Sequence, residues 1–122
     1  MVLVKAAAQL PTFAAADGCQ ISEVVHPAGD HTSPGVSLAR ALVPPAGATQ
    51  PHSLDFLEIY YIISGKGVMH AGEETAPLAP ETCVYLPAGT VQWVENTSAQ
   101  EPLIFLCVCH PGYDPAGDHP AT

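Results

Sequence analysis

The stretch HSLDFLEIYYIISGKG, residues 52–67, decides the expected fold. It reads as a β-strand from about residue 54 to 63 that runs into a tight glycine turn at 64–67. His52 and Glu58 are an even number of positions apart, and even spacing on a strand points side chains to one face. An imidazole and a carboxylate in one interior are costly unless they bind something. The stretch therefore predicts a polar binding site on a buried strand.

Short apolar or alternating segments surround this strand. Thirteen prolines and ten glycines, with turn signals about every ten residues, favour an antiparallel sandwich or small barrel without a helix. A single domain is expected over 1–122, with a frayed tail from about residue 111. The other expected strands are an edge strand within 1–10 and strands at 20–25, 36–43, 68–71, 82–86, 91–95 and 103–109.

Composition excludes several classes of function. The net charge is -9, which disfavours nucleic acid and anionic membranes as partners. The apolar runs are too short to span a bilayer, and Lys5, Gln9 and Pro11 interrupt a signal-like N-terminus, so a cytoplasmic location is expected. Cys107 and Cys109 share a face of one expected strand, where a disulfide fits poorly, and most of the four cysteines are interpreted as reduced, buried thiols.

Two segments together resemble the paired motifs of the cupin superfamily. The resemblance implies an all-β fold, a double-stranded β-helix (jelly-roll) barrel of the small, single-domain cupin type. The first motif, about 47–67, and the second, about 81–96, are carried by Gly47, His52, Glu58, Gly65, Pro87, Gly89 and Asn96. The chain departs from the pattern at two ligand positions, because Leu54 and Gln92 stand where the family has histidines.

The resemblance implies a metal site made of His52, Glu58 and Gln92. These donors suit a divalent transition metal such as Zn, Fe, Mn or Ni, and three protein ligands leave positions open for water or substrate. A symmetric turn at 64–67 would place His70 opposite Tyr60, which makes His70 a candidate fourth ligand. The alternative is a core histidine bonded to Tyr60.

The expected function is a metal-dependent enzyme acting on a small organic substrate, of dioxygenase, isomerase, lyase or cyclase type. Glu58, His70 and Tyr60 are the candidate catalytic residues, for proton transfer. Two alternatives stay open: a non-catalytic small-molecule-binding or sensing module, and a vestigial site that holds no metal. A homodimer is expected, formed through the apolar edge at 1–10.

Overall fold

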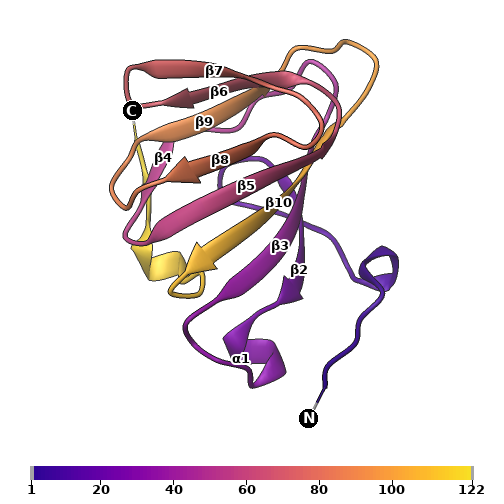
Figure 1. The fold of residues 1–122 in the computed structure, drawn as a ribbon, viewed down its shortest axis with the longest axis vertical. Coiled ribbons are helices and arrows are strands. Elements are labelled where there is room, and N and C mark those ends of the chain that lie inside the picture. The colour runs from indigo at the N-terminus through magenta and orange to yellow at the C-terminus, as the bar shows by residue number, and fades with distance from the viewer. Residues whose placement is uncertain (1, 122) are drawn as a thin grey trace.

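The computed structural model describes residues 2–121 and consists of two antiparallel sheets that face each other (Figure 1). The first sheet has the strand order β1-β2-β3-β10-β5-β8, and the second has the order β11-β4-β9-β6-β7. The expected all-β jelly roll is confirmed. No helix among the described residues is long and apolar enough to cross a membrane.

The first sheet carries the longer strands. Its members are β1 (Phe13–Ala14), β2 (Gln20–Val25), β3 (Ser37–Val43), β5 (Leu57–Ser64), β8 (Cys83–Leu86) and β10 (Leu103–His110). β10 lies in the middle, between β3 and β5, and its buried and half-buried residues alternate along the strand. This alternation follows the period of a strand with one face against the core.

The second sheet is shorter. Its members are β4 (His52–Leu54), β6 (Gly67–Ala71), β7 (Glu74–Leu78), β9 (Gln92–Asn96) and β11 (Asp118–Pro120). In the part of the chain that the structure describes, the connections contain three single-turn helices: η1 (Ala7–Gln9), α1 (Pro27–Asp30) and η2 (Pro115–Gly117).

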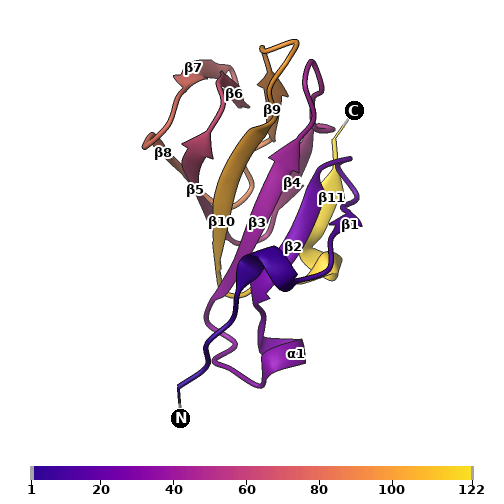
Figure 2. The ribbon, with the colours of Figure 1, turned by 90° about the vertical axis from the view of Figure 1, so that its right-hand side faces the viewer.

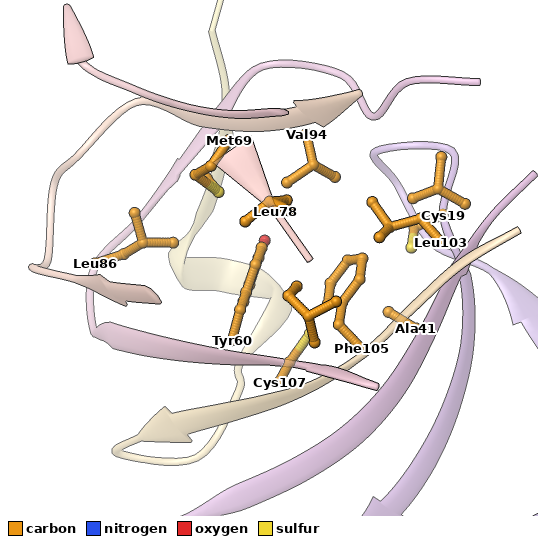
Figure 3. Packing of buried hydrophobic residues seen from close by; sticks show 12 residues of the cluster. Cys19, Ala41, Tyr60, Met69, Leu78, Leu86, Val94, Leu103, Phe105 and Cys107 are labelled. Atoms are coloured by element: carbon orange, nitrogen blue, oxygen red, sulfur yellow. The ribbon is translucent and has the colours of Figure 1, made fainter. Parts of the chain in front are cut away.

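The core lies between the sheets (Figure 3). Met69 and Val94 of the second sheet face Tyr60 and Phe105 of the first, whose rings stack at 4.7 Å between centroids. Ile62 and Leu103 are fully enclosed, with 0% of their surface exposed. Burial of these large apolar side chains is the main favourable contribution to folding.

Both ends of the chain differ from expectation. Residues 2–10 contain the turn η1 and no strand, so the predicted edge strand within 1–10 is wrong for the described residues. The tail from residue 111 is ordered rather than frayed. It forms η2 and then β11, which pairs with β4 through His119 opposite Ser53 (Figure 2).

The predicted hairpin at 64–67 is also wrong, because β5 and β6 belong to different sheets. β5 pairs with β10 and β8, whereas β6 pairs with β7 and β9. The connection crosses between sheets where backbones approach closely: a Cβ at Gly65 would meet the carbonyl oxygen of Pro102, and one at Gly67 that of Glu95. Gly65 also has a φ of 87°. These glycines therefore serve a crossover and not a tight turn.

Candidate functional site

His52 and Glu58 meet, but they do so from two different strands. The chain bends at Asp55 and Phe56, so His52 lies on β4 of the second sheet and Glu58 on β5 of the first. Phe56 fixes this bend by packing edge-on against Tyr113, 5.8 Å between ring centroids. The expectation that one continuous strand carries both side chains is wrong. Their convergence comes from the two layers facing each other.

Glu58 is the centre of a buried polar cluster. Gln92 donates from Nε2 to Oε1 of Glu58 at 2.5 Å and to the hydroxyl oxygen of Tyr60 at 3.0 Å. The thiol of Cys109, on the neighbouring strand β10, lies 3.5 Å from Oε2 of Glu58. A thiol is a weak donor, so Oε2 is the less strongly bound of the two carboxylate oxygens.

Burial governs the protonation of this cluster. Loss of hydration raises the pKa of Glu58, and the hydrogen bond from Gln92 and the nearby His52 oppose that rise. Burial, and then the negative charge of Glu58, hold the pKa of Tyr60 well above its usual value. Tyr60 therefore keeps its proton at neutral pH, and Glu58 accepts or releases one at a higher pH than an exposed glutamate.

His52 has the tautomer that a metal ligand needs. Its Nδ1 lies 2.9 Å from the backbone oxygen of Gln50. Because a carbonyl only accepts, Nδ1 carries the hydrogen and Nε2 keeps its lone pair. Metal-binding histidines are commonly oriented by such a bond from the other ring nitrogen.

Gln92 completes the set from β9, where it is the register partner of His52. Both amide hydrogens are used on Glu58 and Tyr60, so Oε1 is the atom left to act as a ligand. The candidate metal-binding groups are thus one imidazole nitrogen, one carboxylate and one amide oxygen. These ligand types suit a divalent transition metal. Within residues 2–121 no group of three His, Cys, Asp or Glu side chains is placed to hold a metal ion. The amide would therefore have to contribute.

His70 lies outside this cluster, and its predicted position opposite Tyr60 is wrong. On β6 it is paired with Trp93 of β9. Its ring stacks on Trp93 at 3.7 Å, and Nε2 bonds to the Glu95 carboxylate at 3.0 Å. Met69, the adjacent residue, points into the core, so His70 points to the outer face of the second sheet.

The ends of the chain form the mouth of the site, and sequence reasoning missed them. Asp17 precedes β2, and Asp118 begins β11, where it accepts a hydrogen bond of 2.6 Å from the Tyr113 hydroxyl. Burial raises the pKa of Asp17, an effect that the nearby His52 partly offsets. The tail residues were expected to fray, and no spacing pattern links Asp17 to the motifs.

Two cavities adjoin the cluster. Glu58 and Cys109 border one of about 260 Å³ on the inner face of the first sheet. His52 and Asp17 border another of about 120 Å³, and Tyr113 and Asp118 line both. Gln92, with 1% of its surface exposed, lies behind Glu58 and lines neither. Access to the cluster is therefore through Glu58 and His52.

Asn96, the last residue of the second motif, has a structural role. The two hydrogens of its Nδ2 are shared among three backbone oxygens, those of Val43 and Pro44, both at 3.1 Å, and that of Glu101 at 2.8 Å. These bonds join β9 to the ends of two loops.

Two facing antiparallel sheets, with a histidine, a glutamate and an amide gathered between them, define a small β-barrel of the jelly-roll type. The family model for the cupin domain matches residues 39–109, and the chain belongs to this cupin family. Among curated proteins, MJ1618, an uncharacterized protein of Methanocaldococcus jannaschii, is 36% identical over 100 residues, which are 80% of this chain and 77% of the relative.

Solved structures agree with the fold. The polyketide cyclase RemF from Streptomyces resistomycificus superposes with a TM-score of 0.84 at 16% identity, covering 100% of this chain and 87% of the cyclase. A predicted oxalate decarboxylase from Thermotoga maritima gives a TM-score of 0.77 at 22% identity, covering 88% and 98%. A variant of Streptomyces PAC13 with uridine gives 0.79 at 13% identity, covering 100% and 92%. At these identities the likeness extends to the fold alone.

Proposed function

We propose that this cupin is an enzyme that binds one divalent transition metal and acts on a small organic substrate in the cavity beside Glu58. His52 Nε2, the Glu58 carboxylate and Gln92 Oε1 would hold the metal. The observation that carries the proposal is the bond between His52 Nδ1 and the Gln50 oxygen, since it leaves the Nε2 lone pair available on a ring that lies near the buried Glu58 carboxylate. The cyclase and the predicted decarboxylase among the structural neighbours support an enzyme of this fold.

The protein residues supply binding, water exclusion and proton transfer. When bound, the metal would polarise an oxygen of the substrate as a Lewis acid or bind dioxygen. Glu58 lines the cavity and is placed to take a proton from the substrate and return it. Tyr60 stays protonated and holds Gln92 in place. The apolar walls keep water from the reacting atoms.

A second candidate is a binding module without catalysis. It is favoured by the hydrogen bond from Gln92 to Glu58, which occupies one of the two carboxylate oxygens without a metal. In that case the same cavity would bind a small molecule and release it unchanged.

Metal analysis separates the two functions. The protein is purified without a histidine tag from cultures supplemented separately with Zn, Fe, Mn and Ni, and its metal is measured by mass spectrometry. We expect about one ion per chain, lost in the variants His52→Ala and Glu58→Ala.

His70→Ala is the matched control, since His70 lies on the outer face and should leave the metal content unchanged. Absence of metal under every supplement would reject the enzyme in favour of the binding module. Loss of metal in His70→Ala would reject the proposed ligand set.

A further inference from the structure

The larger cavity has the volume of a molecule with two fused rings. At about 260 Å³ it exceeds the ~150 Å³ of a protein cavity that takes up benzene. It lies on the inner face of β2, β3 and β10 and is closed on its other side by Tyr113 and Pro115 of the C-terminal segment.

Its walls are mostly apolar and lined by small side chains. Ala15, Ile21, Ala39, Cys107 and Pro115 contribute to the lining. Burial raises the pKa of Cys107 well above its usual value, so this thiol is neutral and behaves as a small apolar group. Such walls gain free energy by covering a flat hydrocarbon surface.

Charge excludes anions from this cavity. Within residues 2–121 no lysine or arginine lines it, and of the few in the chain Lys5 is already paired with Asp30 at 2.7 Å. The acidic lining residues are Glu23, Glu58 and Asp118. His26 also lines the cavity, but its Nε2 donates to the backbone oxygen of Tyr113 and its Nδ1 accepts from the Ala28 N–H. A carboxylate or phosphate would therefore be desolvated here next to like charges and without a free cationic donor, which is strongly unfavourable.

The cavity walls also disfavour an organic cation. Asp118 already accepts the Tyr113 hydroxyl, and Glu58 accepts from Gln92. Glu23 is exposed on β2, where water screens it. The apolar walls would strip an ammonium group of most of its water, and the two carboxylates at the inner end already accept hydrogen bonds from Gln92 and Tyr113.

One polar contact is open to a ligand. Oε2 of Glu58 accepts a weak hydrogen bond from the Cys109 thiol at 3.5 Å, and both residues line the cavity. A hydroxyl group is a far better donor to a carboxylate than a thiol is. The available position therefore favours a ligand that ends in O–H.

We propose that the cavity takes an uncharged, mostly apolar molecule of about two fused rings, which donates a hydroxyl hydrogen bond to Glu58 Oε2. Its rings would lie against Ala39 and Cys107. This inference rests on the proposed function only for the later chemistry of that hydroxyl, since binding itself needs neither metal nor turnover.

Calorimetric titration with four probes of equal ring size tests the proposal. They are 2-naphthol, naphthalene, 2-naphthoate and the N-methylisoquinolinium cation, used at pH 7 on protein of measured metal content. We expect 2-naphthol to bind at least about tenfold more tightly than each of the others. Equal or tighter binding of the anion or the cation would overturn the inference that the ligand is uncharged. Equal binding of naphthalene would overturn the hydroxyl contact with Glu58.

Two variants locate the binding. Glu58→Gln should lower the affinity for 2-naphthol about tenfold and leave the affinity for naphthalene unchanged. Ala39→Phe fills the cavity and should abolish binding of both rings. Leu42→Phe, on the opposite face of the same strand, is the matched control and should bind like the wild type. Folding of each variant is checked by circular dichroism.

Retained binding in folded Ala39→Phe would place the ligand elsewhere and overturn the proposal. The outcome is independent of the metal analysis. Binding of 2-naphthol by a protein that takes up no metal under any supplement would reject the metal-dependent function and keep this inference. Stoichiometric metal without binding of any probe would reject this inference and keep the metal-dependent function.

Discussion

Gln92 donates to Glu58 across the two sheets at 2.5 Å, so a neutral amide occupies the place where the cupin motif carries a histidine. An imidazole is a stronger donor to Zn or Ni than an amide oxygen is. We expect Gln92→His to raise the metal affinity at least about tenfold, equivalent to ~1.4 kcal/mol, measured by competition with a chromogenic chelator. The exposed Gln100→His is the control, and an equal gain there would mean nonspecific binding to histidine.

The raised pKa of Glu58 predicts how stability depends on pH. The folded protein keeps the Glu58 proton to higher pH than the unfolded chain, where the ordinary value is 4.5. This contribution to the free energy of unfolding is fully present below 4.5 and is lost as pH rises through the folded pKa. Urea unfolding from pH 4 to 8 should show the wild type losing stability relative to Glu58→Gln.

The wild type should likewise lose stability relative to Asp17→Asn as the pH rises, because burial also raises the pKa of Asp17. A stability difference between wild type and Glu58→Gln that stays constant over this pH range would contradict the buried, uncompensated state of the carboxyl.

The four free cysteines should differ sharply in reactivity. Cys83 is exposed on β8, whereas burial raises the pKa of Cys19 to about 12 and that of Cys109 further, which suppresses their thiolates. Brief treatment of the folded protein with iodoacetamide should add one label, and denatured protein should take four. Mass spectrometry checks the count. Cys83→Ser should then remain unlabelled while folded, and a label on Cys109 would show that the site opens.

Phe105 should be one of the most sensitive core positions. It has 1% of its surface exposed and stacks on Tyr60. Phe105→Ala should cost about 3–5 kcal/mol of unfolding free energy, from lost burial and the cavity left behind. Phe13→Ala removes a ring that is 48% exposed and should cost less than about 1 kcal/mol. Similar losses in the two variants, measured by urea denaturation, would contradict the described core.

The homodimer stays a prediction, with a new candidate surface. Tyr61, Ile63 and Tyr85 are exposed large apolar side chains on the outer face of β5 and β8. Two chains of net charge -9 repel least where they present uncharged side chains, and so we expect a second copy to cover this face. Light scattering at micromolar concentration should show a dimer that Tyr61→Glu converts to a monomer.

Val4→Glu tests the alternative interface in the N-terminal segment, where Val4 is 85% exposed. Dissociation by this variant and not by Tyr61→Glu would place the contact there. A monomeric wild type would reject both surfaces.

Local patterns predicted the strands well and the pairing between them poorly. Alternation and turn residues located β2, β3, β8, β9 and β10 within a residue or two, because a half-buried strand repeats every second residue. The partners of β6 were not predictable in this way. Ser64 to Gly67 looks like a hairpin turn, but β5 and β6 lie in different sheets and the glycines pass close to the Pro102 and Glu95 backbones, which no local pattern reveals.

The candidate site shows the same limit. His52, Glu58 and Gln92 do come together, and the two-motif resemblance, not strand periodicity, indicated Gln92. The predicted position of His70 depended on a hairpin at 64–67 that the structure does not contain. Asp17 and Tyr113 were missed because they reach the site through the packing of the chain ends, which no local spacing encodes.

The central position of β10 also sets the order of events during synthesis. β3 and β5 leave the ribosome earlier, yet each needs β10 between them to satisfy its backbone hydrogen bonds. Residues 103–110 also bring Phe105 and Cys109 to Tyr60 and Glu58. A nascent chain stopped before residue 103 therefore exposes two unpaired strand edges and half a core, a state suited to chaperone binding and prone to aggregation. The barrel closes, and Glu58 gains its neighbour Cys109, only after residues 103–110 have emerged.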